Sequence, residues 1–486
     1  MSAVAVLIYA KGYIKPYLGR KSPAQISLHY CGLGVLYLSM LLVVTLRDGF
    51  SFLFAWEVMT LSSFVLMLFD AERREVRRAA LSYLILMHVG FLFLLAGFVT
   101  LYASGLPASF DALALYGEQG GNIIPLFIVF LIGFGMKAGI FPLHVWLPEA
   151  HPAAPAHISA FMSGVMIKTG VYGVMRVVSC FDSHLFAIGL IVLCIGAVTG
   201  LWGVILAALQ NDVKKLLAYS SIENIGIIFI ALGTALLGKA EGSDPIFYAG
   251  MAGALLHTLN HSFFKSLLFM GAGNIYTATH TTSLDDLGGL GKRMPVTAIL
   301  FLVGTLAICA LPPLSGFVSE FLIYMGLLDG IAANGPVTVI ALSGLIFLAL
   351  IGGWPCWPSR NFTGSSSRDF RAAKWPSGHR RFPVRCSRRW HCRWRVSCWW
   401  GWRLCSRCGG SSGSWPGLPM FREPLRSLFR RTYWTARCLF QTASCRLLTG
   451  SGCWWEFPSY CGCCARGSCA VVQKALRLHG IAALRR

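Results

Sequence analysis

Charged residues are scarce in this chain of 486 residues. They make up 13% of it, whereas soluble domains carry about 25%. This scarcity excludes an ordinary soluble protein. The chain has instead long apolar runs, which recur from about residue 27 to residue 353. Each run is long enough to cross roughly 30 Å of hydrocarbon as a helix. The sequence therefore predicts an all-α, multi-pass transmembrane helical bundle.

Signals for export and for cofactor binding are also missing. The N-terminal stretch MSAVAVLIYAKGYIKPY lacks the small-residue cleavage site of a signal peptide. Residues 1–353 contain no Cys-x2-Cys pair, no Gly-rich nucleotide loop and no flavin or haem ligand set. We therefore expect this part to bind no cofactor and no metal, and to do no redox chemistry of its own.

The charge is distributed unevenly along the chain. Residues 354–486 hold 24 Lys and Arg against 3 Asp and Glu, while residues 1–353 hold 18 against 17. The later segment also holds 13 of the 17 cysteines and 12 of the 15 tryptophans. Two compositions are joined near Gly353, which predicts a membrane domain over 1–353 and a separate basic tail over 354–486.

The apolar runs predict about ten spans, each helical because backbone in a bilayer must satisfy its own hydrogen bonds. They are residues 27–46, 48–69, 79–102, 123–146, 156–178, 184–209, 216–238, 246–273, 295–329 and 336–353. Prolines mark two helix breaks: Pro142 and Pro148 near the end of the fourth span, and Pro312 and Pro313 inside the ninth. The ninth span is either one broken crossing or two short elements. Such breaks survive only where they are buried in protein or line a polar cavity, so they indicate a polar interior.

Alternating crossings divide the basic loop residues into two unequal sets. One side carries Lys11, Lys15, Arg20, Lys21, Arg73, Arg74, Arg77, Arg78, Lys214, Lys215, Lys292 and Arg293. The other carries Arg47, Arg176 and Lys239. Because basic loops stay in the cytoplasm, we expect the larger set there and the chain in the cell (inner) membrane. Lys214 and Lys215 are interpreted mainly as topology anchors, with a role in proton uptake as the alternative.

Five ionisable residues inside the predicted spans are singled out: Glu57, Lys137, Lys168, Lys265 and Glu320. Together they cost on the order of 12–17 kcal/mol if unpaired, at roughly 2.5–3.5 kcal/mol each. They could snorkel from helix ends or form purely structural ion pairs. Because they are spread over separate spans, a relay explains them better: buried titratable groups exchange protons when an opposite charge approaches.

A polar stripe runs along the predicted span 246–273. His257, His261 and Lys265 are spaced i, i+4, i+8 and so share one helical face. Proton relay, structural hydrogen bonding and metal binding are the possible roles. No carboxylate or cysteine joins the two histidines in that helix, which disfavours a metal site. We therefore add His257 and His261 to the predicted proton-carrying residues.

Four further histidines have more ambiguous positions. His144, His151 and His157 flank the first break, where they could either hydrogen-bond the freed backbone or carry protons. His88 is alone on an apolar helix, which predicts a satisfied packing residue.

Four stretches together resemble the antiporter-like, proton-translocating membrane subunits of NADH–quinone oxidoreductases, Mrp-type antiporters and membrane-bound hydrogenases. They are GFGMKAGIFPLHVWLPEAHPAAPAHISAFMSGVMIKTG, NDVKKLLAYSSIENIGII, LNHSFFKSLLFMGAG and LPPLSGFVSEFLIY. The formate hydrogenlyase and hydrogenase-4 branch is the most similar in the forms FAWEVMTLSS, EAHPAAPAHISA and SSIENIG. The likeness covers essentially residues 1–353.

The resemblance implies a fold and a role for each matching residue. The fold has two inverted repeats of five helices, each with one broken helix. Glu57 would pair with Lys137 of the first broken helix, Lys168 would be the bridging lysine and Lys265 the central lysine. His257 and His261 would link two half-channels that end at Glu320. The family has about three further helices before the one at 27–46, so the N-terminus is expected to be truncated.

The tail, residues 354–486, resembles nothing in that family. It could be a basic segment that binds nucleic acid or anionic lipid, or a zinc module built on Cys405, Cys408, Cys461, Cys463 and Cys464. A frameshifted translation of the remaining helices explains it better, because Leu-Ala codons read one base late yield Trp, Pro and Cys. We expect the tail to be disordered and to bind no nucleic acid.

The sequence leaves three hypotheses for function. The first is a proton- or Na+-translocating subunit, driven by electron transfer in other membrane subunits and a peripheral hydrogenase or quinone-reductase arm. The second is a truncated, frameshifted product that does not function. The third is a stand-alone Mrp-like cation/proton antiporter subunit.

Overall fold

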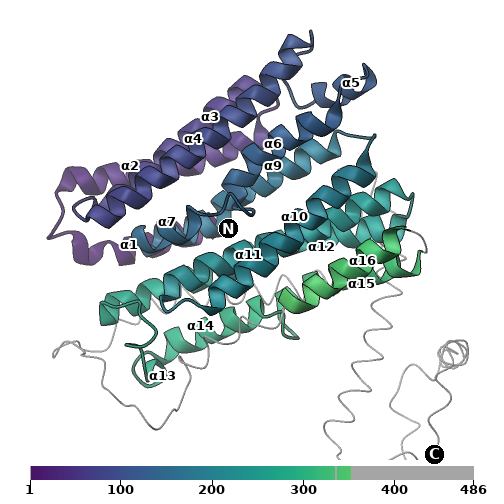
Figure 1. The fold of residues 1–486 in the computed structure, drawn as a ribbon. Coiled ribbons are helices and arrows are strands. Elements are labelled where there is room, and N and C mark those ends of the chain that lie inside the picture. Colours follow the sequence, from purple (N-terminus) through teal and green to yellow (C-terminus); the bar gives the residue numbers. More distant parts are fainter. Residues whose placement is uncertain (1, 334–335, 352–486) are drawn as a thin grey trace, which may run out of the picture. The chain divides into compact units, whose positions relative to one another are not determined.

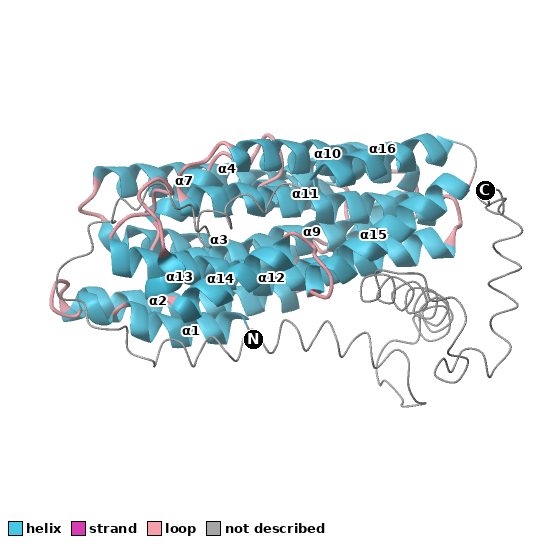
Figure 2. Cartoon of the chain, turned by 90° about the horizontal axis from the view of Figure 1, so that it is seen from below, coloured by secondary structure: helices cyan, strands magenta, loops and turns pink. Residues whose placement is uncertain are grey.

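A computed structural model of the chain describes residues 2–333 and 336–351, and the regular elements in these ranges are helices. The first half contains α1 (Ser2–Tyr13), η1 (Lys15–Tyr17), α2 (Pro23–Thr45), α3 (Gly49–Met67), η2 (Leu68–Asp70), α4 (Arg74–Ala103), α5 (Ala112–Glu118), α6 (Ile123–Ala138), α7 (Leu147–Ala153), α8 (Ala156–Phe161), η3 (Met162–Met166) and α9 (Ile167–Ser179). The second half contains α10 (Leu185–Ala208), α11 (Val213–Ala240), α12 (Asp244–Thr279), α13 (Leu290–Arg293), α14 (Pro295–Ile308), α15 (Ser315–Ala332) and α16 (Pro336–Ile351). Figures 1 and 2 show that the long helices run along one common direction.

Within the described ranges, seven helical segments are long and apolar enough to cross a membrane, and three shorter apolar helices accompany them. The seven are Pro23–Thr45, Gly49–Asp70, Arg74–Ala103, Ala156–Ser179, Leu185–Ala208, Val213–Ala240 and Ser315–Ala332. Each of the ten predicted spans contains a helix, which confirms the multi-pass bundle. The predicted tail, residues 354–486, and the predicted boundary near residue 353 lie outside the described residues.

Side-chain caps fix where several helices begin. Ser22 accepts a hydrogen bond from the Gln25 N–H (3.3 Å), and the Gln25 side chain accepts one from the Ser22 N–H (3.1 Å), which is a capping box before α2. Asp48 caps α3 by accepting from the Ser51 N–H at 2.7 Å. This backbone hydrogen bond lowers the pKa of Asp48 below its ordinary value.

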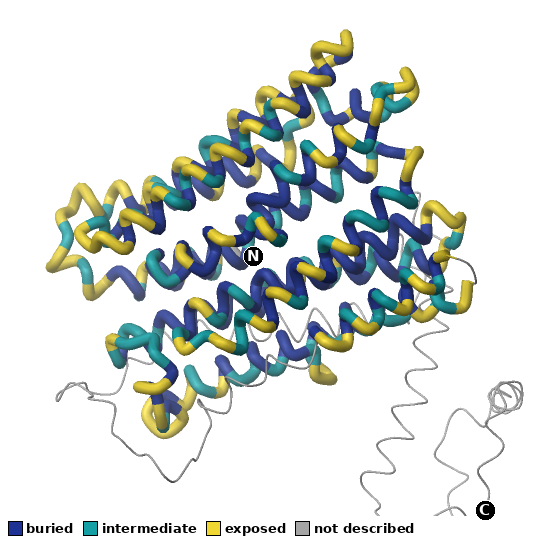
Figure 3. The backbone as a smooth tube through the Cα atoms, viewed as in Figure 1, coloured by how far each residue is buried: buried dark blue, intermediate teal, exposed yellow. Residues whose placement is uncertain are grey.

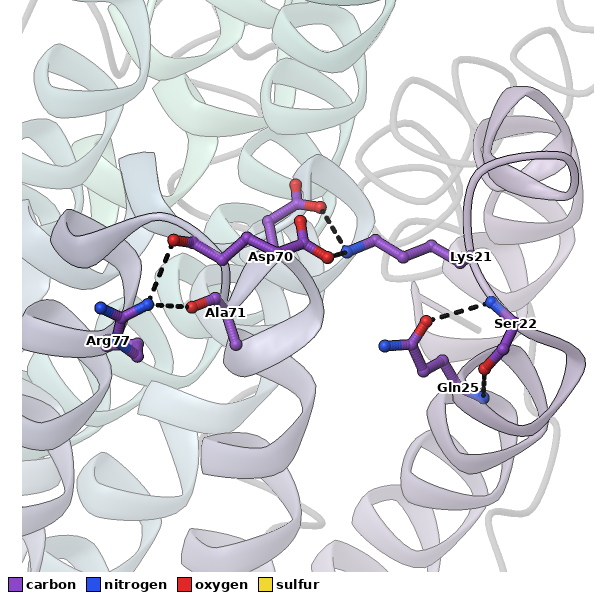
Figure 4. A network of polar contacts seen from close by, with 7 residues as sticks. Lys21, Ser22, Gln25, Asp70, Ala71 and Arg77 are labelled. Carbon is purple, nitrogen blue, oxygen red and sulfur yellow. Dashed lines mark hydrogen bonds and ion pairs between the residues drawn. The ribbon is translucent and has the colours of Figure 1, made fainter.

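A network of polar contacts joins the loops at one end of the bundle (Figure 4). Lys21 Nζ lies 3.5 Å from Asp70 Oδ1 and 2.6 Å from Glu72 Oε1, while Arg77 donates to the carbonyl of Ala71 at 2.6 Å. Burial lowers the pKa of Lys21, but the hydrogen bond to Glu72 and the charge of Asp70 outweigh it and raise that pKa overall. The network holds the connection before α2 against the connection between α3 and α4.

The basic loop residues separate between the two ends of the bundle as the alternation predicts. Lys21 meets the α3–α4 connection, and Lys214 at the start of α11 lies over the ring of Tyr276 near the end of α12. At the other end, Arg176 donates to the carbonyl of Leu46 at 2.7 Å, and Lys239 pairs with Asp182 at 2.8 Å. Which end faces the cytoplasm stays a prediction.

The bundle consists of two repeats with the same packing order. In the first, α2 packs on α3, α3 on α4, α4 on α6 and α7, and α6 on α9. In the second, α10 packs on α11, α11 on α12, α12 on α14 and α15, and α15 on α16. Each repeat has five crossings, an odd number, so the second repeat begins at the end of the bundle where the first one finishes. The two are therefore inverted, as expected.

The first break lies between α6 and α7. Gly139 ends α6 with φ of 80°, a left-handed conformation that favours glycine. The freed carbonyl of Met136 accepts from Trp146 Nε1 at 2.9 Å, and the Phe141 N–H donates to Thr199 Oγ1 at 3.0 Å. Pro142 lies in this break. Pro148 does not, and the prediction is wrong there: it sits in the first turn of α7, where a missing N–H costs nothing.

The second break, residues 309–314, lies between α14 and α15 and contains Pro312 and Pro313 as predicted. Gly304 of α14 lies against Leu268 of α12, and Gly253 farther back on α12 lies against Ile323 of α15. Because the contact moves steadily back along α12, α14 and α15 form one interrupted crossing antiparallel to it, and Figure 1 shows them in line. This settles the question left open by the sequence.

Burial differs strongly between the central and the outer helices. All of the membrane-crossing window of α11 is buried, against 33% of the windows of α2 and α4. Figure 3 shows the same contrast along the tubes. Side chains in this window of α11 are therefore enclosed by protein, so polar groups there depend on protein partners.

The close approach of Gly316 to Ala307 at the second break predicts that a larger residue at position 316 destabilises the protein. A Cβ added to Gly316 would overlap the carbonyl oxygen of Ala307, so Gly316→Ala should destabilise the protein by about 1–3 kcal/mol. Thermal unfolding in detergent measures this. Gly34→Ala is the matched control, because its Cβ would meet no atom within 4 Å. Equal unfolding temperatures for the two variants would contradict the packing described.

Candidate functional site

Lys137 lies in the last turn of α6, just before the first break, and its side chain is buried with 1% exposure. Nζ donates to Thr60 Oγ1 of α3 at 3.1 Å and to the Tyr83 hydroxyl of α4 at 3.0 Å. It also lies 5.7 Å from the centre of the Trp56 ring. The Tyr83 hydroxyl is in turn 2.6 Å from Ser63 Oγ. A cluster of hydroxyl groups therefore solvates this ammonium group.

Glu57 of α3 occupies a different environment from the one expected. Its side chain is 21% exposed, and Oε1 lies 3.0 Å from Nε2 of His88 on α4. Trp56 and Thr60 share the face of α3 that meets Lys137, and Glu57 is rotated about 100° from it. In the described part of the chain Glu57 and Lys137 form no ion pair, although Lys137 lies within electrostatic reach of Glu57.

His88 was predicted to be a satisfied packing residue, and half of that prediction is wrong. The ring is satisfied, because Nδ1 lies 2.9 Å from the Leu84 carbonyl and Nε2 lies against Glu57. It is not a packing residue, because 46% of the side chain is exposed on the outer face of α4. Sequence alone could not identify the outward face of this uniformly apolar helix.

Lys168 follows a π-turn, η3, of the kind often found at functional sites. The Ile167 N–H points to the Met162 carbonyl five residues back. The partly buried Lys168 donates a short hydrogen bond to the Ser163 carbonyl. Ser163 Oγ lies 2.8 Å from Ser221 Oγ of α11, so the π-turn connects this lysine to the central helix.

Lys265 of α12 is fully buried and reaches the same part of α11 from the other side. Nζ donates to Ser220 Oγ at 2.6 Å and to the Leu217 carbonyl at 2.9 Å. Ser220 and Ser221 are consecutive residues. Lys265 therefore binds α11 directly, whereas Lys168 is connected to the adjacent position of α11 through Ser163. The two lysines, predicted as central and bridging, lie within electrostatic reach of each other.

Contacts of a different chemical kind lie between Lys137 and the region around Lys168. The Tyr83 hydroxyl, which binds Lys137, lies 3.8 Å from Met166 Sδ in η3, and Thr169 Oγ1 donates to Met59 Sδ at 3.7 Å. Thioether sulfur is a weak acceptor. In the described residues, the region between Lys137 and Lys168 is therefore bridged by sulfur contacts, whereas serine hydroxyls and backbone carbonyls lie between Lys168 and Lys265.

The polar stripe of α12 continues toward the second break. His257 Nε2 lies 3.1 Å from Asn224 Oδ1 of α11, and its Nδ1 lies 3.1 Å from Ser319 Oγ of α15. Asn260 donates to the Ser315 carbonyl at 2.7 Å, which satisfies backbone freed at the break. Glu320, next to Ser319, is buried with 5% exposure. The predicted histidine stripe thus joins α11 to the second broken crossing.

His261 lies one turn from His257 on α12 and has no exposed surface. In the described part of the chain neither ring nitrogen has a hydrogen-bond partner. The ring lies within electrostatic reach of both Lys168 and Lys265. The structure therefore brings together Lys168, His257, His261 and Lys265 around α11, and their role as proton carriers stays a prediction.

The histidines near the first break do not fill the first of their two predicted roles, hydrogen bonding to the freed backbone. The backbone there is bonded by Trp146, by Ser159 (to the His151 carbonyl, 2.8 Å) and by Lys214 (to the Ala154 carbonyl, 2.9 Å). The flanking histidines do not supply those bonds among the described residues. His157 instead meets His29 of α2, with their Nε2 atoms 2.7 Å apart.

The two adjacent lysines at the start of α11 lie in different environments. Lys214 is buried with 5% exposure and bonds backbone across the bundle, whereas Lys215 is exposed. The burial of Lys214 disfavours its interpretation as a topology anchor, and the same interpretation of Lys215 stays a prediction.

One buried titratable residue was missed at the sequence level. Glu223 of α11 is 2% exposed, and its Oε2 atom has no hydrogen-bond partner among the described residues. It lies within electrostatic reach of Lys265 and Glu320. The signal was available, because Glu223 interrupts the apolar run 216–238 in the same way as the five residues that were singled out.

Residues 47–349 match the family described as NADH:quinone oxidoreductase/Mrp antiporter, TM, which is more than half of the chain. The chain belongs to this family. Hydrogenase-4 component B of Escherichia coli (strain K12) is 35% identical over 356 residues, 72% of this chain and 52% of that protein. Formate hydrogenlyase subunit 3 of the same organism is 41% identical over 199 residues, 41% of this chain and 33% of that protein.

A solved structure extends the likeness of this antiporter-family chain to the fold. A chain of the membrane-bound sulfane sulfur reductase, an archaeal respiratory membrane complex, matches with a TM-score of 0.64 at 22% identity. The match covers 77% of this chain and 73% of that one. The antiporter-family chain spans about half the length of hydrogenase-4 component B, and its tail lies beyond the family match.

The hydroxyl cluster around Lys137 predicts that removing one of its hydroxyl groups lowers the stability of the protein. Tyr83→Phe takes away an acceptor from a buried ammonium group and should destabilise the protein by about 1.5–3 kcal/mol. Thermal unfolding in detergent measures the loss. Tyr102→Phe, the same change on the same helix at a residue 67% exposed, should cost less than about 0.5 kcal/mol. Equal stability of the two variants would show that the Tyr83 hydroxyl does not hold Lys137.

Proposed function

We propose that this chain moves protons across the membrane through a line of titratable side chains. The line is Glu57, Lys137, Lys168, Lys265, His257, His261 and Glu320. Its members come from both inverted repeats, so the path extends sideways through the bundle from the first broken crossing to the second. The family described as NADH:quinone oxidoreductase/Mrp antiporter supports this assignment.

The strongest support for the proposal is the way in which the three lysines are held. The ion pairs among the described residues include none of Lys137, Lys168 and Lys265. Their ammonium groups are held by neutral hydroxyls and backbone carbonyls. A charge buried without a counter-ion is costly, and a lysine solvated in this way can release its proton without breaking an ion pair. A purely structural lysine would be expected beside a carboxylate.

The driving force is proposed to come from partner subunits. Relatives of the chain include a component of hydrogenase-4 and a subunit of formate hydrogenlyase. We propose that this chain likewise joins other membrane subunits and a peripheral redox arm, of the hydrogenase or quinone-reductase type. Electron transfer there would change the charge near one end of the line and displace protons along it.

The role of Lys137 can be tested in inside-out membrane vesicles from cells whose own copy of the gene carries the substitution. Adding the electron donor drives transport, and quenching of a pH-sensitive dye reports proton uptake. Lys137→Ala should lower the uptake rate about tenfold or more, because the first broken crossing loses its buried lysine. Lys215→Ala, an exposed lysine, should behave as wild type.

Full proton uptake by Lys137→Ala, at normal amounts of protein in the membrane, would refute the proposed role. Repeating the assay with radioactive sodium and a protonophore identifies the ion. Sodium uptake that survives the protonophore would assign Na+ instead of the proton to this line.

A further inference from the structure

We infer that Glu223 is a further proton-carrying residue, placed on α11 between Lys265 and Glu320. The inference rests on the proposed function and deepens it: the second half of the line would contain a carboxylate step in addition to the histidines. Neither the family likeness nor the five ionisable residues first singled out assigns a role to this position.

The burial of Glu223 without full hydrogen bonding is the first argument. The residue is 2% exposed in a helix that is buried along its whole membrane-crossing window. Its Oε2 atom has no hydrogen-bond partner in the ranges that the structure describes. Buried polar atoms nearly always have a partner, and each exception needs an explanation. A carboxylate kept only for stability would be expected to use both oxygens.

The position of Glu223 relative to Lys265 is the second argument. Ser220, which accepts from Lys265 Nζ at 2.6 Å, lies three residues before Glu223. Residues three apart share a helix face, so Glu223 lies one turn along α11 from the Lys265 contact. Each of the two groups lies within electrostatic reach of the other, although they form no ion pair in the described part of the chain.

The position relative to Glu320 is the third argument. Asn224, the next residue of α11, contacts His257, and His257 contacts Ser319, the residue before Glu320. The carboxyl groups of Glu223 and Glu320 are within electrostatic reach. Two neighbouring carboxylates repel each other when both are ionised. Such a pair therefore holds one proton readily, and moving that proton from one carboxylate to the other costs little free energy.

The transfer can be written as two balanced proton steps. The protonated amine of Lys265 gives one proton to the Glu223 carboxylate, which leaves a neutral amine and a neutral carboxylic acid. Glu223 then gives that proton to the Glu320 carboxylate and returns to its ionised form. No other reactant is consumed, and both steps occur among side chains enclosed by α11, α12 and α15.

Two measurements on the full chain in its native membrane test the inference. The first is proton uptake in inside-out vesicles. Glu223→Gln keeps the shape but cannot carry a proton, so it should lower the uptake rate about tenfold or more. Glu223→Asp should restore most of the rate, and Glu149→Gln, an exposed glutamate of α7, should match wild type. A merely structural role would not separate Gln from Asp in this way when both variants are present at equal amounts.

The second measurement needs no variant. Dicyclohexylcarbodiimide adds to protonated carboxyl groups in apolar surroundings, and mass spectrometry of the unsubstituted chain locates the adduct. We expect an adduct on Glu223 and none on Glu149. Absence of the adduct on Glu223 overturns the inference even if Glu223→Gln fails to fold.

The outcomes separate this inference from the proposed function. If Lys137→Ala abolishes uptake and Glu223→Gln leaves it unchanged, the proposed function stands and this inference fails. If Lys137→Ala leaves uptake unchanged, the proposed function itself fails, and the inference fails with it.

Discussion

The cost of holding ammonium groups away from water governs this structure. Three lysines, at 137, 168 and 265, lie inside membrane-spanning segments, each at roughly 2.5–3.5 kcal/mol if unsolvated. Hydrogen bonds to charged groups contribute about 1.5–3 kcal/mol each, so two acceptors per lysine offset that cost. Lys137 and Lys265 each have two. The positions of Thr60, Tyr83 and Ser220 therefore follow from the lysines that they solvate.

The broken crossings follow from the same constraint. An unbroken helix keeps its carbonyls and N–H groups within its own ladder and offers little to a buried charge. The breaks release backbone groups that must then be bonded by side chains from neighbouring helices. Trp146 and Thr199 do this at the first break, and Asn260 does it at the second. These same bonds fix the ends of α6 and α15 close to Lys137 and Glu320.

Much of this arrangement could be predicted from the sequence, because a charge inside an apolar run is conspicuous. The apolar runs predicted the spans, and prolines predicted both breaks. The positions of Lys137, Lys265 and Glu320 were found from their charge inside an apolar run. Rotation about a helix axis was not predictable. Glu57 and Trp56 are neighbours in sequence, yet one faces His88 near the outer surface and the other faces Lys137. The contact of His29 with His157 joins residues 128 positions apart, and no local pattern encodes it.

The two halves of the line differ in a way that bears on how it would work. Between Lys168 and Lys265 the contacts are serine hydroxyls, which both donate and accept, together with the backbone carbonyls of Ser163 and Leu217. Between Lys137 and Lys168 the described contacts run through the sulfurs of Met59 and Met166, which can only accept weakly. In the proposed line, a proton that moves from Lys137 to Lys168 within the first repeat therefore meets weak acceptors beside the π-turn. Since that turn also positions Ser163 for Lys168, a small change in its backbone would alter both the acceptor of the lysine and the width of the sulfur gap.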